Sequence, residues 1–402
     1  MTRLYSGNSY INEFKAEVTG VIPCKKGWEV LLSETAFYPE SGGQPSDHGW
    51  INECPVVNVV DSGEGPIHIV SAGDLTAGEE VSCRIDWNRR FDHMQHHTGQ
   101  HILSQAFLEV SGATTVSFHL GGDDVTIDLS VESLPEDKLL ETENRANQAV
   151  TDNMEIKVYS VDSSQQKDIP VRKPSTRQGA VRIVEISGWD YSPCGGTHCR
   201  STGEIGLIKI TRLERVRQQL RVHFCCGSRA LRDFQKKSWL ADNLGNLMSC
   251  GENDLLANIN KLMERSSRQA EEIKGLQERI FSLIAEKIKH NVQDINGWKT
   301  IIQLVEDVDL KDLNKLATKL LQEDTAEIVL LAAEKPRPGI LFARINTERL
   351  PDLRSVLEAT QGMFGGKGGG SPDRVQAGGT DPKGLLPALE KARTMLMQDT
   401  GK

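Results

Sequence analysis

Two short motifs far apart in the chain limit its fold more than any other feature. In HTGQH, His97 and His101 stand four positions apart, and in CGGTH the same spacing separates Cys194 from His198. Residues four apart on a helix share a face, so such a pair can aim its donor atoms at one point. Thiolate and imidazole are ligands that suit zinc rather than magnesium or calcium. If both motifs serve one ion, the fold must bring a helix and a distant loop together.

The histidine spacing alone leaves the first ligand pair open. His93 lies one turn before His97 on the same helical face, so the pairs 93/97 and 97/101 are equally compatible with one ion. His96 is turned by about 100° and is a poor partner for either pair. Histidines that are exposed or hydrogen-bonded, without any metal, are the other interpretation of this stretch.

The second motif carries alternatives of its own. A Gly-Gly turn lets the backbone bend Cys194 and His198 toward one point, whereas the side chain of Cys199 is expected to leave that side of the turn. A Cys/His site with four ligands is either closed and structural or keeps a position for water or substrate, and the sequence leaves both open. The chain has eight cysteines without the spacing of a disulfide framework, so we expect free thiols or metal ligands.

Composition sets broad limits on the class of protein. A length of 402 residues predicts about two to four domains, and 38% hydrophobic residues is typical of a globular chain. No apolar run approaches the roughly 20 residues that cross a bilayer, and no charged-then-apolar segment begins the chain, so we expect a cytoplasmic protein. The net charge of -9 argues against non-specific nucleic-acid binding but permits a structured RNA held by local basic patches.

The first 235 or so residues predict an α+β fold. Up to residue 86, β-branched residues alternate or cluster between Gly and Pro turns, which predicts short strands that close into a small β-barrel or sandwich. From Trp87 the pattern becomes helical, with Asp92 as a candidate cap and an end at the SGATT stretch. Two strands, a helix opened by a capping box at Ser133 and Glu136, and further strands complete this α+β core.

The rest of the chain predicts a helix and a further domain. Residues 252–290 carry a heptad-like apolar stripe that Ser266 and Gln269 interrupt, which indicates a helical spacer or short coiled coil; a helix packed on its own protein is the alternative. The stripe consists of Ile259, Leu262, Ile273, Leu276, Ile280 and Leu283. Alternating strand and helix patterns follow and indicate a small α/β domain. We therefore predict a β-barrel domain at 1–86, a zinc-binding α+β domain at 87–240, a helical linker at 250–290 and a glycine-rich α/β domain at 291–402.

Taken together, the motifs resemble a known family. HTGQH followed by CGGTH is similar to the HxxxH and CxxxH pair of the alanyl-tRNA synthetase editing domain and of its free-standing relatives, the alanyl-tRNA editing proteins of the AlaX type. TAFYPESGGQPSDHG at 35–49 resembles the family's FYPxGGGQxxDxG segment, with Ser41 in place of the first glycine. IGLIKITRLERVRQQLRVHFCCG resembles the strand pair after the second zinc motif, and GGKGGGSPDRVQAGG resembles the glycine-rich signature of the DHH-associated C-terminal domain. The matches keep the family's order and cover most of the chain.

The resemblance implies one zinc ion per chain, held by His97, His101, Cys194 and His198. It implies a stand-alone deacylase that hydrolyses, in trans, the ester between serine or glycine and tRNA(Ala). Because the first of the family's segments already begins at Thr35, we expect the synthetase's ATP-using domain to be missing and aminoacylation to be absent. The family also implies that a homodimer forms through 252–290 and the C-terminal domain.

Polar residues beside these motifs are candidates for placing water and for sensing the serine hydroxyl. The candidates are Thr35, Gln44, Ser117 and His119. Each could instead only hydrogen-bond the backbone, as polar residues of turns and strand edges often do. A site that hydrogen-bonds a hydroxyl rejects a substrate that lacks it, so discrimination of serine from alanine is chemically reasonable. Gln100 and Leu220 depart from the family's pattern, and we expect them to affect substrate preference rather than the reaction.

Basic and glycine-rich stretches are candidates for contact with tRNA. Strand alternation would place Arg215, Arg217 and Arg221 on one face, where they could follow phosphates; a solvated, salt-bridged strand is the alternative. In the glycine-rich segment, exposed backbone N–H groups beside a lysine could approach a phosphate closely, although a glycine run can also be a flexible loop. The residues concerned are Gly366, Lys367, Gly368 and Gly369.

Two other functions fit the same residues. Threonyl-tRNA synthetase editing domains use a similar HxxxH and CxxxH pair, so a deacylase of this kind could act on a different mischarged tRNA. In another class, the chain could be a non-catalytic tRNA-binding protein with a structural zinc. The FYPxGGGQ-like segment and the C-terminal glycine motif favour the alanine-type tRNA.

Overall fold

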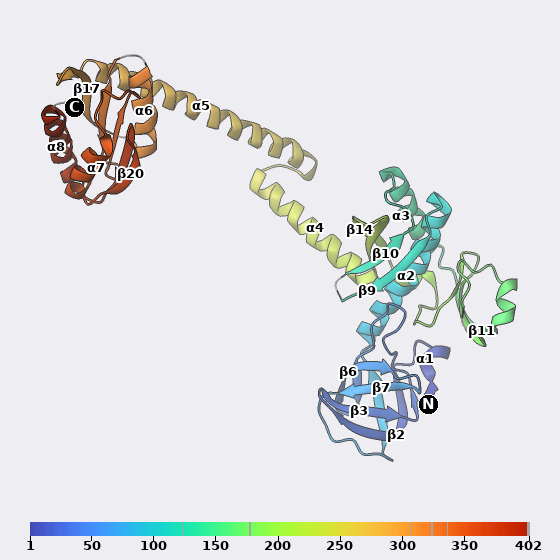
Figure 1. Cartoon of the computed structure of the whole chain (residues 1–402). Helices are drawn as coiled ribbons and strands as arrows, with labels where there is room; N and C mark the ends of the chain where they lie inside the picture. Colours follow the sequence, from blue (N-terminus) through green and yellow to red (C-terminus); the bar gives the residue numbers. More distant parts are fainter. Residues whose placement is uncertain (123, 177, 307, 323–324, 336, 400–402) are drawn as a thin grey trace. The chain divides into compact units, whose positions relative to one another are not determined.

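The computed structural model describes residues 1–122, 124–176, 178–306, 308–322, 325–335 and 337–399. In these ranges the chain is a mixed α/β protein, and it divides into two compact units, Met1–Leu247 and Met248–Lys402 (Figure 1). None of the helices in these ranges is both long enough and apolar enough to cross a membrane.

The first unit begins with a closed barrel of six strands, in the order β2-β3-β7-β6-β5-β8 (Figure 1). Its strands are β2 (Glu13–Cys24), β3 (Gly27–Leu32), β5 (Gly49–Ile51), β6 (Cys54–Asp61), β7 (Pro66–Val70) and β8 (Glu80–Ile85). Along β8, the buried Val81, Cys83 and Ile85 alternate with exposed residues, as a strand with one face in the core requires. The predicted N-terminal β-barrel is confirmed. Before and within it, helix α1 (Leu4–Gly7) and the parallel pair β1 (Thr2–Arg3) and β4 (Glu34–Thr35) complete this region.

Helix α2 (Trp87–Ser111) follows the barrel and is buried along most of its length. It begins after Asp86, whose carboxylate accepts a hydrogen bond from the backbone N–H of Arg89, and it ends at Gly112, which has a left-handed φ of 70°. The predicted cap at Asp92 is wrong, because Asp92 lies inside the helix and accepts hydrogen bonds from the guanidinium of Arg229. The predicted start at Trp87 and the predicted end at the SGATT stretch are confirmed.

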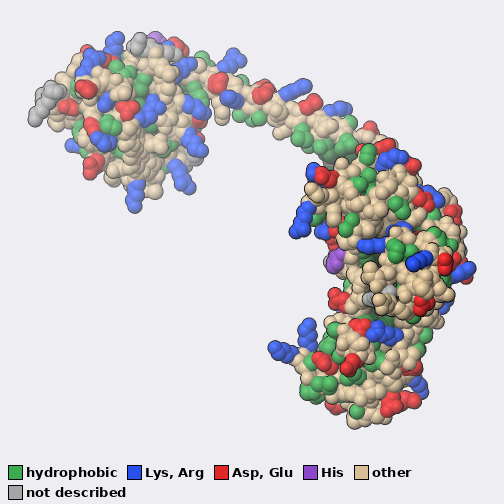
Figure 2. Space-filling view, turned by 45° about the vertical axis from the view of Figure 1, so that its right-hand side comes forward, with side chains coloured by type: hydrophobic (Ala, Val, Ile, Leu, Met, Phe, Trp, Pro, Cys, Tyr) green, Lys and Arg blue, Asp and Glu red, His purple; other side chains and the backbone are tan. Residues whose placement is uncertain are grey.

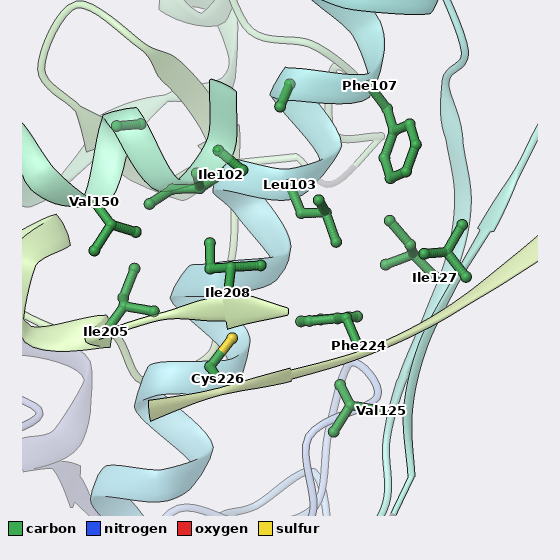
Figure 3. Packing of buried hydrophobic residues seen from close by; sticks show 14 of the residues in the cluster. Ile102, Leu103, Phe107, Val125, Ile127, Val150, Ile205, Ile208, Phe224 and Cys226 are labelled. Carbon is green, nitrogen blue, oxygen red and sulfur yellow. The ribbon is translucent and has the colours of Figure 1, made fainter. Parts of the chain in front are cut away.

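A four-stranded antiparallel sheet, ordered β14-β15-β10-β9, packs against α2. Its strands are β9 (Thr115–Leu120), β10 (Val125–Leu129), β14 (Ile208–Val216) and β15 (Gln219–Cys226). Figure 3 shows Leu103 and Phe107 of α2 directed toward Ile127 and Phe224 of the sheet, whereas Ile102 lies on the side of Val150, and all of these side chains are buried. This apolar layer holds the helix that carries the first histidine motif.

Helix α3 (Glu136–Thr151) covers the same core with Ala146 and Ala149. The predicted capping box at Ser133 and Glu136 is wrong, because the helix begins at Glu136 itself. Its N-cap is Pro135, which makes no side-chain hydrogen bond to the helix.

A smaller sheet positions the second motif. Its strands β11 (Ile156–Asp162), β12 (Ala180–Ile186) and β13 (Asp190–Pro193) lie in that order and are antiparallel. The strand β13 ends just before Cys194, whose backbone N–H donates to Arg182 O at 3.1 Å. Two 3-10 segments, η1 (Ser163–Asp168) and η2 (Thr202–Ile205), follow β11 and the motif.

Two long helices come next, α4 (Gly227–Met248) and, after η3 (Glu252–Asp254), α5 (Leu255–Lys289). The predicted helix over 252–290 is confirmed. Its apolar stripe stays largely exposed within the second unit, with Leu262 at 56% and Leu283 at 71% of full exposure, so the rest of that unit does not cover it. Self-association through this helix stays a prediction.

The second unit ends in an α/β domain, as predicted. Its sheet has the order β16-β17-β18-β19-β21-β20. The strands are β16 (Val292–Ile295), β17 (Trp298–Val305), β18 (Ile328–Ala333), β19 (Gly339–Arg344), β20 (Lys367–Ser371) and β21 (Arg374–Gly378). One face packs on α6 (Leu310–Gln322) and the end of α5, and the other on α7 (Leu353–Gln361) and α8 (Leu385–Gln398), with short turns η4 (Gly362–Phe364) and η5 (Pro382–Gly384) between them. The glycine-rich segment is a β-hairpin, not a loop, and its strand β20 is an exposed sheet edge.

Candidate metal centre

Four side chains from the two motifs meet in the first unit. His97 and His101 project from α2, and Cys194 and His198 from the loop after β13; their ligand atoms all lie within 4.8 Å of one another. The ring centroids of His97 and His198 are 4.6 Å apart. The three histidines are buried and Cys194 is half-buried. We call these residues the four-residue cluster.

Each histidine of the cluster is held by an oxygen at Nδ1. His97 Nδ1 donates to Gln44 Oε1 at 2.7 Å, His101 Nδ1 to Asp190 Oδ2 at 3.1 Å, and His198 Nδ1 to the carbonyl of Gly196 at 3.1 Å. With the proton on Nδ1, the lone pair of Nε2 is free to bind a metal ion, which is the usual arrangement of zinc-bound histidine.

The atoms that face the middle of the cluster have no ordinary partners. The Nε2 atoms of His101 and His198 are buried and have no hydrogen-bond partner among the described residues. The third, His97 Nε2, lies 3.2 Å from Cys194 Sγ. Buried polar atoms without partners are rare in folded proteins. A thiol and three imidazoles aimed at one point therefore fit a zinc ion.

The electrostatics of the cluster favour a thiolate at Cys194. Burial would raise the pKa of this thiol, but the charges of His97 and His198 beside it lower the pKa well below its ordinary value. The neighbouring Cys199 differs, because burial raises its pKa to about 12. A metal ligand has to be deprotonated, so Cys194 is suited to the role and Cys199 is not.

The segment FYPESGGQ and the motif CGGTH are locked together. The amide of Gln44 donates from Nε2 to Thr197 Oγ1 at 2.8 Å, and its Oε1 accepts from the backbone N–H of Thr197 at 3.2 Å. A Cβ at Gly196 would lie 2.2 Å from Cε1 of His97, so only glycine permits this approach of loop and helix. Gln44 thus lies at the cluster and orients His97. Its part in placing water or sensing the serine hydroxyl stays a prediction.

A buried ion pair fastens the same segment to α2. Arg90 and Asp47 are both fully buried, and Arg90 Nε donates to both carboxylate oxygens at 3.0 Å. The guanidinium also donates to Ser9 O at 2.8 Å and to Ala36 O at 2.5 Å. This pair holds Gln44 in reach of His97.

Sequence reasoning missed Asp190, the partner of His101. Burial would raise the pKa of Asp190, but the hydrogen bond and charge of His101 and the charge of Arg172 keep it below its ordinary value. Arg172 Nε donates to Asp190 Oδ1 at 2.6 Å, and Ser192 Oγ donates to Oδ2 at 2.8 Å. The only signal in the sequence was a carboxylate four positions before Cys194, since His101 is 89 positions away.

The other predicted substrate residues make contacts away from the cluster. Thr35 Oγ1 donates to His68 Nε2 at 2.8 Å inside the barrel. Ser117 Oγ donates to Asp128 Oδ2 at 2.7 Å. On β9, Phe118 directs its ring to that of His97, 5.2 Å between centroids, so alternation turns Ser117 and His119 to the opposite face of the strand.

The structure decides between the ligand pairs that the histidine spacing left open. His96 is a structural residue: its Nδ1 donates to Asp92 O at 2.7 Å, and its Nε2 accepts from the backbone N–H of Cys226 at 3.0 Å. His93 is buried but does not belong to the four-residue cluster. Of the two pairs that spacing allowed, His97 and His101 are the pair that meets the second motif.

The three arginines predicted to follow phosphates do not share a face. In the register of β14 and β15, Arg221 lies opposite Glu214 and Arg215 opposite Leu220, so the side chains of Arg215 and Arg221 leave opposite faces of the sheet. Arg217 lies in the turn between the strands with φ 58°. The prediction of a common face is wrong, because it continued the alternation of one strand through a turn. Arg221 is ion-paired with Asp128 and Arg215 with Glu132.

Two pockets open beside the cluster. One, of about 430 Å³, is lined by His97, Cys194 and Gly196 together with Tyr38. The other, of about 610 Å³, is lined by His101 and by polar side chains that include Gln100, Ser104 and Thr115. Ser104 Oγ accepts from Gln100 Nε2 at 2.8 Å and from Thr115 Oγ1 at 2.6 Å. The cluster therefore borders both pockets.

Three family models match parts of the chain. The model of the second additional domain of threonyl and alanyl tRNA synthetases matches residues 181–221, which contain the CGGTH motif. The class II (A) tRNA synthetase model matches residues 7–89, and the DHHA1 domain model matches residues 297–398.

Curated relatives match nearly the whole chain. The alanyl-tRNA editing protein AlaX-L of Pyrococcus horikoshii is 32% identical over 418 residues, which cover 98% of this chain and 99% of that protein. The alanyl-tRNA editing protein Aarsd1 of Rattus norvegicus is 28% identical, with 94% of each chain covered. An alanine–tRNA ligase of Methanobrevibacter smithii is 30% identical over 94% of this chain but only 44% of its own length, so the chain spans less than half of that ligase.

Proposed function

The chain belongs to the alanyl-tRNA editing protein family, and from that premise we propose that it is a trans-acting deacylase of tRNA(Ala) mischarged with serine and, as a second substrate, glycine. The single observation that supports catalysis most is the four-residue cluster, in which three Nε2 atoms and one thiolate converge between two pockets. A purely structural protein has no need to keep such a site at the border of two pockets.

The residues present fit one zinc ion per chain, held by His97, His101, Cys194 and His198. When bound, zinc would supply Lewis-acid chemistry, by which a carbonyl is polarised, a water is acidified or a substrate amine is oriented. In the reaction, the oxygen of water bonds to the ester carbonyl carbon, the bond from that carbon to the ribose oxygen breaks, and the ribose oxygen takes a proton.

We propose that the residues around the cluster act by position. Gln44 fixes the ring of His97, and Asp190 fixes that of His101, so both Nε2 atoms keep one direction. Of the polar candidates, Gln44 is the one we propose to act at the reacting ester, whereas Thr35, Ser117 and His119 would act only through the packing of the barrel and sheet. A site that hydrogen-bonds the serine hydroxyl would reject alanine strongly.

The test is ester hydrolysis on a panel of substrates. Purified protein is incubated with Ser-tRNA(Ala), Gly-tRNA(Ala), Ala-tRNA(Ala) and Ser-tRNA(Thr), and the remaining ester is measured over time. We expect rapid loss of serine from tRNA(Ala) and little loss of alanine. Preference for Ser-tRNA(Thr) would identify an editing enzyme of the threonyl type, and no hydrolysis on any substrate would leave a tRNA-binding protein with a structural metal.

Variants separate metal chemistry from general damage. His97→Ala and Cys194→Ala should each lower the rate by about 10³-fold or more and reduce bound zinc, because each removes a ligand. The exposed His290 and the half-buried Cys250 lie in the second unit, so His290→Ala and Cys250→Ala are matched controls that should retain full activity. Asp190→Asn should have an effect between those of the ligand variants and the controls. It should lower the zinc affinity by about 10- to 100-fold, because His101, which Asp190 orients, remains.

A further inference from the structure

A third pocket of the first unit, of about 650 Å³, lies where the first turns of α2 and α4 meet. Its wall includes Arg89, Arg229, Arg232 and the buried His93. None of its lining residues belongs to the four-residue cluster. We propose that this pocket binds a phosphate group of the RNA backbone. The proposal rests on the proposed function, since the tRNA substrate supplies the phosphate.

The charges of the pocket favour an anion. Three arginines face one carboxylate, Asp92, whose partner is Arg229: Arg229 Nε donates to both carboxylate oxygens, at 2.9 Å and 3.1 Å. Arg89 Nε donates a hydrogen bond to Ser46 O at 3.1 Å. The exposed Arg232 donates one from NH1 to Ser228 Oγ at 3.3 Å. The outer N–H groups of Arg89 and Arg232 are thus placed to bind phosphate oxygens.

Helix direction adds to this charge. The positive ends of two helices, α2 and α4, contribute lining residues, Asn88 from the first turn of one and Ser228 from the first turn of the other. Neither helix has an acidic residue in its first turn, but the carboxylate of Asp86, just before α2, already accepts a hydrogen bond from Arg89 N–H, so the free helix end at the pocket is mainly that of α4. Unpaired backbone N–H groups and the helix dipole make such ends favourable for phosphate.

A buried histidine provides an independent indication of a ligand. His93 lines the pocket with only 1% exposure, and its Nδ1 has no hydrogen-bond partner in the part of the chain that the structure describes. Burial, together with the charge of Arg89, lowers the pKa of His93 to about 3, so the ring is neutral near pH 7. A neutral imidazole can donate one N–H to an incoming phosphate oxygen, which would satisfy this atom.

The pocket also has an apolar wall. Trp87 and Phe91 line it and stack on each other with 5.7 Å between ring centroids. A flat aromatic surface beside cations suits a nucleotide, whose sugar or base can lie against the rings. On the face that Figure 2 shows, Lys and Arg side chains are mixed with Asp and Glu, and the chain is acidic overall, so RNA contact depends on local sites of this kind.

The test measures binding of an uncharged tRNA(Ala) transcript at several salt concentrations. Arg232→Glu changes an exposed residue and reverses its charge, so it should raise Kd about tenfold and reduce the slope of log Kd against log salt by about 1. Lys236→Glu makes the same change one turn further along α4, outside the pocket lining, and is the matched control.

A second variant separates binding from folding. Ser228→Glu places a carboxylate in the first turn of α4, where it favours the helix but repels phosphate. We expect an unchanged or raised melting temperature together with weaker tRNA binding. Inorganic phosphate, used alone as a competitor, should displace tRNA from the wild type at lower concentration than from Arg232→Glu.

The outcomes for this pocket and for the proposed function are distinct. If Arg232→Glu and Ser228→Glu bind tRNA like the wild type, or if Lys236→Glu weakens binding equally, the phosphate pocket is refuted while deacylation can still be measured. If no substrate is hydrolysed but the two pocket variants still lose tRNA affinity, the deacylase proposal fails and the pocket stands.

Discussion

The two units of the chain bury different kinds of side chain. The interior of the first unit contains ionisable and amide groups, among them Arg90, Asp47, His68 and Asp190. In the second unit, the described residues that are both buried and polar are Thr300 and Thr360. Buried polar groups lower stability unless they are paired, so their concentration in the first unit indicates a fold that gives up stability to fix geometry.

The paired groups lie along one path to the metal centre. Arg90 and Asp47 hold the segment that carries Gln44, and Gln44 orients His97; Asp190 orients His101. The second unit has no comparable interior network among its described residues, so any part that it has in binding tRNA must come from its surface.

The largest difference in stability between the two units should follow from breaking the buried ion pair. Asp47→Ala leaves the guanidinium of Arg90 buried without a carboxylate, and we expect a loss of about 3–5 kcal/mol in the free energy of unfolding. Thr360 in the second unit donates within its own helix, to Val356 O at 2.8 Å and Leu357 O at 3.2 Å, so Thr360→Val should change stability by about 1 kcal/mol or less. Hydrogen exchange followed peptide by peptide during urea unfolding measures both units in one sample.

A double variant identifies the cause of that loss. If the unpaired charge is responsible, Asp47→Ala with Arg90→Met should recover a large part of the stability, because both charges are then gone. If the double variant is no more stable than Asp47→Ala, the loss comes from packing and not from the unpaired charge. The two interiors would then not differ in the way proposed.

Acid should lower the stability of the first unit more than that of the second, by a smaller amount than breaking the ion pair does. Burial lowers the pKa of His68 from 6.5 to about 4, while a hydrogen bond with Val30 O acts weakly in the opposite sense. The unfolded chain therefore takes up this proton first as the pH falls. The stability that depends on neutral His68 is fully present above about pH 6.5 and is lost toward pH 4, on the order of 3 kcal/mol. The histidine of the second unit, His290, is exposed.

We therefore expect the barrel to lose exchange protection between about pH 6.5 and pH 4 while the second unit keeps it. Loss of metal in acid would add to this effect in the wild type, so the comparison is with His68→Gln, which cannot take up the proton. The barrel of the variant should lose stability less steeply in this window. Equal slopes for the two proteins would show that His68 is not the titrating group.

The sequence predicted those parts of the molecule that depend on local pattern. The barrel strands and the long helix through HTGQH follow from periodicity. Spacing left the pairs 93/97 and 97/101 open, and the resemblance to the family selected the four residues that meet in the cluster. Asp190 could not be predicted, because nothing local relates it to His101 across 89 positions. For the same reason, the faces of Arg215 and Arg221 depend on strand register across a turn, which the residues of one strand do not encode.

The smallest effect should come from the surface of the second unit, at the glycine hairpin. Lys367 lies on the exposed edge strand β20, and Gly368 pairs there so closely with β21 that a Cβ would lie 1.9 Å from Gln376 O. If this edge contacts RNA, Lys367→Ala removes one phosphate contact, and tRNA Kd should rise about two- to fourfold, with the catalytic rate at saturation unchanged. Lys391→Ala, on an exposed position of α8, is the control. Because Lys367 and Lys391 are both exposed, the stability of the second unit should not change with either variant. A loss of catalytic rate with Lys367→Ala would mean that the division of roles between the units is wrong.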